Sequence, residues 1–318
     1  MSLYRMAILS RDAEAYRAAL STHKLRGLEL GQTASCARDL DPEGIEILIA
    51  DPDLAAPVVA EFGDLVWLQS TWAGNTPLVN AGRRDYQLTG VKGIFGHLMR
   101  EYVAAYLLHF SRAVDRFHPR IGTPGATKPI AWDPPAVGTL KGKCVGVLGA
   151  GSIGTALVDL ARCFEFQIIG LTRSGHSTGE FDAVYAAADK LAMASQCDFL
   201  VSLLPDTPAT RHFIDAALLS ALPAHCVLIN AGRGGNIDDS ALLAALDRGT
   251  IKAAVLDVFD EEPLPADHPY WQHPRVWITQ HTAALSNPAD VVNVFADNYR
   301  RWISGEPLDY LIDFDEGY

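Results

Sequence analysis

Three polar residues, Arg233, Glu262 and His281, each come after a short apolar run that is typical of a buried strand. Ligands of open parallel sheets bind at the carboxyl ends of the strands, so we expect these side chains to lie close together. An arginine can hold a carboxylate through two parallel hydrogen bonds, and a histidine kept protonated by a carboxylate can donate a proton. The alternatives are solvated loop charges for Arg233 and Glu262, and a capping or core-edge histidine for His281. As a set, the three favour a site that holds a substrate carboxylate and protonates the carbonyl beside it.

A glycine-rich turn, Gly149-Ala150-Gly151-Ser152-Ile153-Gly154, joins an apolar run to a predicted helix over Thr155–Cys163. In such a turn the first glycine makes the bend, the second lets a pyrophosphate approach the backbone, and the third lets the helix lie close to the sheet. The free N–H groups of the helix then face the phosphates. An ordinary glycine-rich turn is the alternative. Because strand, turn and helix follow in the required order, we predict dinucleotide contacts from Gly149, Gly151, Ser152, Ile153 and Gly154.

The segment Thr172-Arg173-Ser174 indicates which dinucleotide is bound. A carboxylate about 20 residues after the turn would accept a hydrogen bond from the ribose 2′-hydroxyl of NAD, but no acidic residue stands at this strand end. The guanidinium of Arg173 can instead pair with a 2′-phosphate, and the hydroxyls of Thr172 and Ser174 can add donors. A solvated surface arginine is the alternative. We predict NADP(H) as the preferred cofactor, with NAD(H) as the second choice.

The elements that must position these residues fall into two groups. From Lys143 onward, six apolar runs alternate with helices or loops, which predicts a doubly wound parallel sheet; the runs are Cys144–Leu148, Gln167–Leu171, Phe199–Leu204, Cys226–Ile229, Ala253–Leu256 and Val276–Thr279. The first hundred residues also predict βα units, with strands at Arg5–Leu9, Glu46–Ala50 and Leu65–Gln69. Between the groups lie a predicted helix, Gly96–Ala113, and a Pro-rich surface connection, Phe117–Pro135.

These residues resemble those of the D-isomer-specific 2-hydroxyacid dehydrogenases, and the resemblance runs through nearly the whole chain. Its most specific stretches are Gly149–Gly154, Leu204–Thr210, Asn230–Asp238, Asp257–Pro265 and Gln280–Ala284. The resemblance implies an α/β fold of two doubly wound parallel-sheet domains, with a Rossmann dinucleotide-binding domain inserted into a flavodoxin-like substrate domain. It places the substrate domain at residues 1–105 and 287–318 and the NAD(P)-binding domain at residues 106–286, with helices near Gly96–Ala113 and Asn287–Trp302 as the crossings.

The resemblance also implies roles for single residues. Arg233 would anchor a 2-oxoacid, His281 would be the acid/base, and Glu262 would hold and charge that histidine. Asp257 resembles a family carboxylate near the nicotinamide. The loop Ser70–Asn75 matches one whose backbone N–H groups help to hold the substrate carboxylate; its Trp72 either restricts the pocket to small acids or simply packs the loop. We expect substrate contacts from Trp72, Ala73, Gly74 and Arg233, and further cofactor contacts from Leu204, Pro205, Thr210, Ala231, Gly232, Asp257, His281 and Ala283.

Within the family, the chain is similar to the glyoxylate/hydroxypyruvate reductase A group. The similarity rests on Gly93–Gly96 leading to Glu101-Tyr102, on the Thr172–Ser174 loop and on the tail Asp313–Tyr318, whereas Gln280 departs from the proline that usually precedes the histidine. The implied activity is the NADPH-dependent reduction of small 2-oxoacids, glyoxylate to glycolate and hydroxypyruvate to D-glycerate. The alternatives are another acid, such as phosphoglycerate or a branched 2-oxoacid, and a dinucleotide-sensing binding protein built on the same fold.

Composition limits the partners and the compartment. The 318 residues include 26 basic and 38 acidic side chains, and a net charge of -12 repels nucleic acid and anionic membrane surfaces. Five widely spaced cysteines without a CxxC pair fit a reducing cytoplasm, and no histidine spacing is typical of a metal site, so we expect no metal. We expect no membrane span, since no apolar run reaches about 18 residues. The resemblance implies a homodimer packed through the dinucleotide domains.

Overall fold

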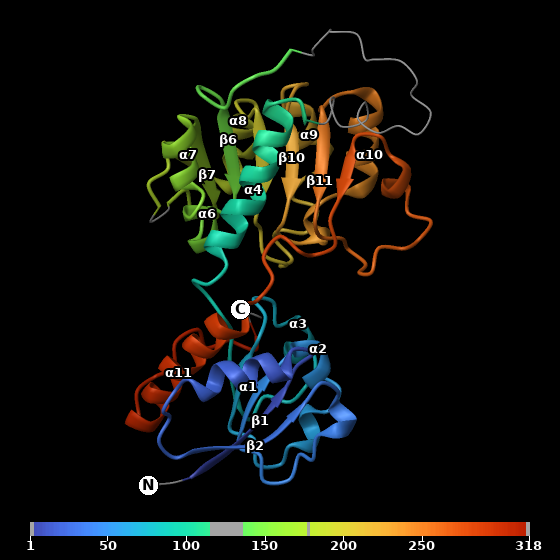
Figure 1. The fold of residues 1–318 in the computed structure, drawn as a ribbon. Helices are drawn as coiled ribbons and strands as arrows, with labels where there is room; N and C mark the ends of the chain where they lie inside the picture. The colour runs from blue at the N-terminus through green and yellow to red at the C-terminus, as the bar shows by residue number, and fades with distance from the viewer. Residues whose placement is uncertain (1–2, 115–135, 177–178, 316–318) are drawn as a thin grey trace, which may run out of the picture. The chain divides into compact units, whose positions relative to one another are not determined.

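The computed structural model describes residues 3–114, 136–176 and 179–315 (Figure 1). The chain divides into two compact units, the first made of Met1–Ile94 with Ser286–Tyr318 and the second of Phe95–Leu285. The predicted surface connection Phe117–Pro135 and the last three residues of the tail lie outside the described residues. Among the described residues, no helix has the length and apolar character needed to cross a membrane.

The first unit is built on a five-stranded parallel sheet in the order β2-β1-β3-β4-β5, the order of flavodoxin-like sheets. Its strands are β1 (Tyr4–Leu9), β2 (Leu28–Ala34), β3 (Ile47–Ala50), β4 (Trp67–Ser70) and β5 (Gln87–Thr89), and its helices are α1 (Ala13–Ser21), α2 (Pro52–Ala55), α3 (Thr76–Val79) and α11 (Pro288–Ser304). The C-terminal α11 packs beside α1, and its Phe295 stacks on Trp67 of β4 with the ring centroids 4.9 Å apart. Both ends of the chain therefore contribute to this unit.

The second unit is built on a seven-stranded parallel sheet in the order β12-β11-β10-β9-β6-β7-β8. Its strands are β6 (Cys144–Leu148), β7 (Gln167–Thr172), β8 (Ala183–Ala186), β9 (Phe199–Ser202), β10 (Val227–Asn230), β11 (Ala253–Leu256) and β12 (Val276–Ile278), and its helices are α4 (Gly96–Ser111), α6 (Ser152–Thr155), α7 (Val158–Phe164), α8 (Lys190–Ala194), α9 (Ala216–Ala221) and α10 (Asp239–Arg248). The strand order reverses between β6 and β9, as in a Rossmann sheet.

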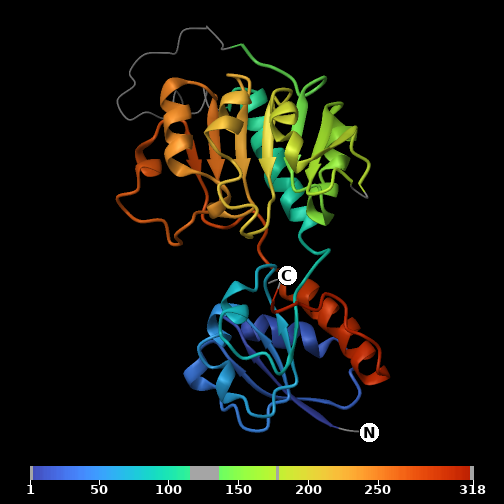
Figure 2. The ribbon, with the colours of Figure 1, turned by 180° about the vertical axis from the view of Figure 1, so that it is seen from behind.

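Helices cover both faces of this sheet. One face carries α4 and α7, and the other carries α8, α9 and α10, as the two opposite views show (Figures 1 and 2). Alternate residues of β6 point to opposite faces of the sheet. Val145 and Val147 pack with α4 and α7, and Cys144 and Leu148 pack with α8, α9 and α10. A strand buried on both faces must be apolar throughout, which explains the continuous apolar runs. The predicted fold class, two doubly wound parallel sheets, is confirmed.

Three strands that the sequence analysis did not identify, β2, β5 and β8, all lie at the edges of their sheets. Edge strands are partly solvated and need no continuous apolar run. In β8 all four residues are only partly buried, and in β2 only Ala34 is fully buried. The apolar signal used to find strands is therefore weakest at the edges.

The first crossing between the units lies at Ile94–Phe95, whereas the sequence analysis placed it between residues 105 and 106, inside a helix. All of α4 belongs to the second unit, because Met99, Val103 and Leu107 pack into the same hydrophobic cluster as the β6 side chains. The second crossing lies at Leu285–Ser286, one residue before the expected position. Both crossings are thus short connections that precede α4 and α11.

Candidate active site

The glycine-rich turn follows β6 at the carboxyl edge of the second sheet. Gly149 has a positive φ of 94°, and a Cβ there would lie 2.9 Å from the Leu203 carbonyl oxygen. A Cβ at Gly154 would lie 2.6 Å from the Gly149 oxygen, so this glycine lets the helix approach the strand. Around Gly151, by contrast, no atom of the described residues other than its chain neighbours lies within 4 Å of the Cβ position, and this open space beside the first helical N–H groups fits a pyrophosphate.

The helix after the turn is interrupted, whereas the sequence predicted one continuous helix over Thr155–Cys163. It forms as α6 and then α7, because the N–H groups of Ala156 and Leu157 bond to carbonyls three residues back, at 3.1 and 3.0 Å. This tighter turn is of the 3₁₀ type. Ser152 and Ile153 accordingly lie within the helix, in its first turn.

The Thr172–Ser174 segment ends β7 in a closed loop. The Thr172 hydroxyl accepts the N–H groups of Gly175 and His176 at 3.0 and 3.1 Å, and donates to the His176 carbonyl at 3.0 Å. This hydroxyl is therefore engaged within the loop. Arg173 and Ser174 are exposed, and no carboxylate in the described ranges forms an ion pair with Arg173.

Arg233 follows β10 and is held by two buried asparagines that the sequence analysis did not single out. The Asn230 amide donates to the Arg233 carbonyl at 3.0 Å, and the Arg233 N–H donates to the Asn236 side-chain oxygen at 3.1 Å. Burial lowers the pKa of Arg233, while the charges of Asp206 and Glu262 act in the opposite direction. Within the described parts of the chain no carboxylate forms an ion pair with this guanidinium. Its charge is thus available to an anion.

Gly234 explains how the loop after β11 reaches Arg233. A Cβ on Gly234 would lie 1.8 Å from the carbonyl carbon of Phe259, so only glycine allows the two backbones to meet. Glu262, three residues further along that loop, is thereby brought to the same edge of the sheet. The signal in the sequence is the pair of glycines after Arg233, Gly234 and Gly235.

His281 and Glu262 form a hydrogen-bonded pair, with His281 Nδ1 and Glu262 Oε2 at 2.8 Å. The other Glu262 oxygen accepts the N–H of Phe259 at 2.9 Å. Burial alone would raise the pKa of Glu262, but these hydrogen bonds and the charges of His281 and Arg233 outweigh it and lower the pKa. The ionised carboxylate thus faces Nδ1, and Nε2 remains the ring nitrogen that can exchange a proton with a ligand.

Asp257, directly after β11, is only 1% exposed and organises the segment that carries His281. Its backbone oxygen accepts the His281 N–H at 2.7 Å, and its carboxylate accepts the N–H groups of Thr282 and Ala283 at 2.8 and 3.0 Å. This bonding fixes the loop in a chain that has Gln280 in place of the expected proline. The carboxylate is thus occupied by this segment.

The remaining predicted cofactor residues line the same edge. A Cβ on Gly232 would lie 2.8 Å from the backbone N and O of Leu204, so these two segments are in close contact. The Thr210 hydroxyl donates to the Pro205 carbonyl at 2.7 Å, and this hydrogen bond stabilises the loop after β9. Ala231 continues β10 beyond Asn230 and donates its N–H to the Ser202 carbonyl at 3.1 Å.

The Trp72 loop belongs to the first unit and follows β4 at the carboxyl edge of its sheet. The Ser70 hydroxyl accepts the Trp72 N–H at 3.1 Å, and the Thr71 hydroxyl donates to the buried Asp51 carboxylate at 2.6 Å. In the described ranges, neither Ala73 nor Gly74 has an intramolecular acceptor for its N–H. These two N–H groups are thus available to an anion.

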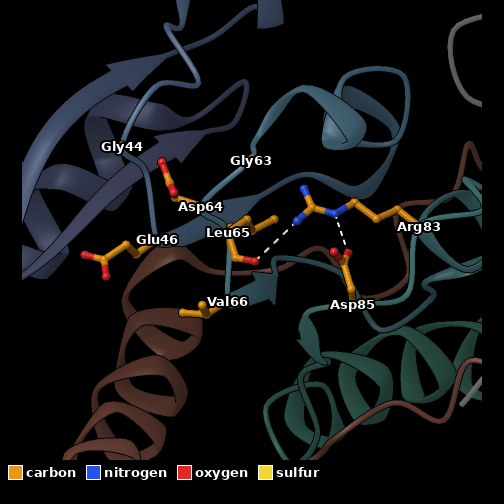
Figure 3. Close-up of a pocket in the computed structure, with 8 residues that line it drawn as sticks. All are labelled: Gly44, Glu46, Gly63, Asp64, Leu65, Val66, Arg83 and Asp85. Carbon is orange, nitrogen blue, oxygen red and sulfur yellow. Dashed lines mark hydrogen bonds and ion pairs between the residues drawn. The ribbon is translucent and has the colours of Figure 1, made fainter.

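A pocket of about 550 Å³ also lies in the first unit, at the opposite, amino-terminal ends of β3, β4 and β5 (Figure 3). It is lined by Gly44, Glu46, Gly63, Asp64, Leu65, Val66, Arg83 and Asp85. Arg83 is engaged there by the Asp85 carboxylate at 2.5 Å and by backbone carbonyls, including that of Val59 at 2.8 Å. The Trp72 loop follows β4, so within the first unit this pocket and that loop lie at opposite ends of the strands.

Comparison with known proteins identifies the chain as an NAD(P)-dependent oxidoreductase. The profile of the D-isomer specific 2-hydroxyacid dehydrogenase NAD binding domain matches residues 104–283. A D-isomer specific 2-hydroxyacid dehydrogenase family protein from Aeromonas salmonicida subsp. salmonicida A449 is 39% identical with a TM-score of 0.92, over 99% of this chain and 100% of that one. The chain therefore belongs to the D-isomer specific 2-hydroxyacid dehydrogenase family, and its second unit is the NAD-binding domain.

Two further similar structures contain a bound nicotinamide cofactor. A D-isomer specific 2-hydroxyacid dehydrogenase from Xanthobacter autotrophicus Py2, in complex with NADPH and MES, is 27% identical with a TM-score of 0.85, over 100% of both chains. An NADPH-dependent glyoxylate/hydroxypyruvate reductase from Sinorhizobium meliloti, in complex with NADP and sulfate, is 28% identical with a TM-score of 0.83, over 99% of this chain and 100% of that one.

Proposed function

We propose that the protein is an NADPH-preferring reductase of small 2-oxoacids, with glyoxylate and hydroxypyruvate as substrates and glycolate and D-glycerate as products. The observation that carries this proposal is the His281–Glu262 pair, at 2.8 Å, on the same sheet edge as the Arg233 guanidinium, which has no ion-pair partner among the described residues. Reduction of a 2-oxoacid requires a positive charge that binds the carboxylate and a proton donor for the carbonyl oxygen. Arg233 and His281 would supply these two groups. The first unit would be the substrate domain, contributing Trp72, Ala73 and Gly74.

Each residue of the set has a separate task in this reaction. NADPH, when bound, supplies the hydride that the carbonyl carbon receives. Arg233 binds the substrate carboxylate and polarises the adjacent carbonyl. His281 donates its Nε2 proton to the carbonyl oxygen, which becomes the hydroxyl, and Glu262 orients the ring through Nδ1 and stabilises its protonated form.

The NADPH preference rests on the loop after β7. Arg173 is exposed and has no ion-pair partner among the described residues, and no carboxylate stands in the Thr172–His176 turn; Glu180, later in the loop, pairs with Arg162. The relatives from Xanthobacter and Sinorhizobium, whose structures hold NADPH and NADP, support the same preference. Because the Thr172 hydroxyl is engaged within the loop, Arg173 and Ser174 are the residues we assign to the phosphate.

The test is a panel of 2-oxoacids assayed with NADPH and with NADH. Glyoxylate and hydroxypyruvate should give the highest kcat/KM among glyoxylate, hydroxypyruvate, pyruvate, a branched 2-oxoacid and phosphohydroxypyruvate, and NADPH should exceed NADH. A higher kcat/KM for one of the larger acids would contradict the substrate assignment. NADPH binding without oxidation by any acid would instead favour a dinucleotide-sensing protein.

We further propose that the protein acts as a homodimer in the cytoplasm. Side chains of α4 such as Leu98, Tyr106 and Leu108 remain partly exposed, so this apolar helix is available for packing against a second copy. The five cysteines are free, which fits a reducing compartment. Light scattering after size exclusion should give twice the 34.4 kDa chain mass, and a mass of one chain would contradict the dimer.

A further inference from the structure

The backbone of His281 adopts an uncommon conformation that the protein must hold in place. Its φ is 55°, in the left-handed region, which costs a non-glycine residue roughly 1 kcal/mol or more. The ring is half exposed, so packing around the side chain does not impose this conformation. The hydrogen bonds from His281, Thr282 and Ala283 to Asp257 do so instead.

Asp257 in turn is oriented by a chain of two hydroxyl groups. The Thr279 hydroxyl donates to Asp257 Oδ1, and Tyr102 Oη lies 2.9 Å from Thr279 Oγ1. Because threonine has a single hydroxyl proton, which goes to Asp257, the tyrosine must be the donor in the second contact. Burial raises the pKa of Tyr102, so the phenol keeps the proton that it donates.

The two hydroxyl groups come from distant parts of the second unit. Tyr102 lies on α4. Thr279 follows β12, and its backbone N–H donates to the Leu256 carbonyl at 3.0 Å. The hydroxyl chain therefore fastens the segment before His281 to the helix as well as to Asp257. Removing the Thr279 hydroxyl would leave the Thr282 N–H as the one hydrogen-bond donor to Asp257 Oδ1 among the described residues.

We propose that Thr279, and through it Tyr102, are positioning residues that hold the Asp257 carboxylate in the orientation that fixes the His281 backbone. The ring then meets Glu262 and presents Nε2 in a constant direction. This inference rests on the proposed function, because the benefit of a fixed ring is proton donation to the substrate. Neither residue is assigned a contact with substrate or cofactor.

The test compares Thr279→Val, which keeps the shape but removes the hydroxyl, with Thr279→Ser, which keeps the hydroxyl. Small misplacements of reacting groups can cost up to about a hundredfold in rate, so we expect Thr279→Val to lower kcat on the order of tenfold. The Kd for NADPH and the KM for glyoxylate should change less than about twofold, since the glycine-rich turn, Arg173 and Arg233 are untouched. Thr279→Ser should recover most of kcat, and Tyr102→Phe should fall between the wild type and Thr279→Val.

A matched control is Thr139→Val, which removes a hydroxyl that accepts the Lys141 N–H before the amino-terminal end of β6, opposite to the strand ends that carry the site. It should leave kcat unchanged. A Thr279→Val variant with wild-type kcat would overturn the inference. So would an equal loss of kcat in Thr279→Ser, or a loss of NADPH binding that accounts for the lower rate.

A second readout needs no turnover and separates this inference from the proposed function. With ¹³C-labelled histidine, the His281 ring signal, assigned from His281→Ala, should shift in Glu262→Gln because the two side chains touch. That shift should persist in the Thr279→Ser background and largely disappear in Thr279→Val. If it persists in Thr279→Val, the inference fails; if the wild type reduces no 2-oxoacid while the ring signals behave as expected, only the proposed function fails.

Discussion

His281 is the residue on which the proposed reaction depends most directly. Its Nδ1 is engaged by Glu262, and the lowered pKa of that carboxyl keeps the carboxylate charged. The sequence identified both residues from their positions after predicted strands, and the resemblance implied that Glu262 holds His281, but not which ring nitrogen it contacts. That pairing leaves one ring nitrogen for proton donation.

Replacing His281 by alanine should lower kcat by on the order of a hundredfold or more, the usual scale for a lost general acid. NADPH binding, followed by nucleotide fluorescence, should change little because the glycine-rich turn is intact. His23→Ala, in the first unit, is the control and should retain wild-type kcat. Turnover within a few-fold of the wild type in His281→Ala would remove this residue from the proton-donor role.

Replacing Arg173 by aspartate should reverse the cofactor preference. A carboxylate repels the 2′-phosphate of NADPH and can accept a hydrogen bond from the 2′-hydroxyl of NADH. The ratio of kcat/KM for NADPH to that for NADH should fall by at least about tenfold, since one bond to a charged group contributes about 1.5–3 kcal/mol. An unchanged ratio would mean that Arg173 does not contact the phosphate.

At the scale of secondary-structure elements, Asp198 ties together the amino-terminal ends of three neighbouring strands. Its carboxylate accepts the Cys144 N–H of β6 at 2.8 Å and meets Lys143 Nζ at 2.9 Å and His225 Nε2 at 2.8 Å, just before β10. Burial would raise the pKa of Asp198, but these hydrogen bonds and the charge of Lys143 outweigh it and lower the pKa. The ionised form is therefore more stable in the folded protein than in the unfolded chain.

Asp198→Asn should lower the free energy of unfolding by about 1 kcal/mol at pH 7, the typical contribution of partly exposed charged hydrogen bonds. A carboxyl whose pKa is lowered on folding stabilises fully above its unfolded pKa of about 3.9, and this stabilisation is lost as pH falls through the folded value. The difference between variant and wild type should thus shrink below about pH 4 in urea titrations. Asp64→Asn, at an exposed position, is the control, and a difference independent of pH would contradict the argument.

At the scale of the whole molecule, each unit has a hydrophobic core of its own. The two clusters around β6–β12 contain only residues of the second unit, and the cluster around β3 and β4 takes Ile312 from the returning C-terminal segment. The first unit thus needs both chain ends, whereas the second is a continuous segment. The net charge of -12 spans both units, so local arginines rather than bulk charge must attract the anions.

The fragment Phe95–Leu285 should therefore fold alone and bind NADPH within a few-fold of the full chain's Kd, because its core and cofactor turn are complete. Removing Ser286–Tyr318 from the full chain should unfold the first unit but spare the second. Limited proteolysis should then yield a protected fragment close to Phe95–Leu285. A fragment that binds no NADPH, or complete digestion of the truncated chain, would show that the units depend on each other.

The sequence by itself determined the buried strands, the glycine-rich turn, the Arg233, Glu262 and His281 set and the family, because each leaves a local pattern. Only the tertiary structure decided the edge strands β2, β5 and β8, the first crossing at Ile94–Phe95 and the contacts that fix the site. Tyr102 and Thr279 meet across 177 positions, and Gly234 admits the Phe259 backbone. Such contacts depend on which strands are neighbours in the sheet, and strand order leaves no signal in the residues that later touch.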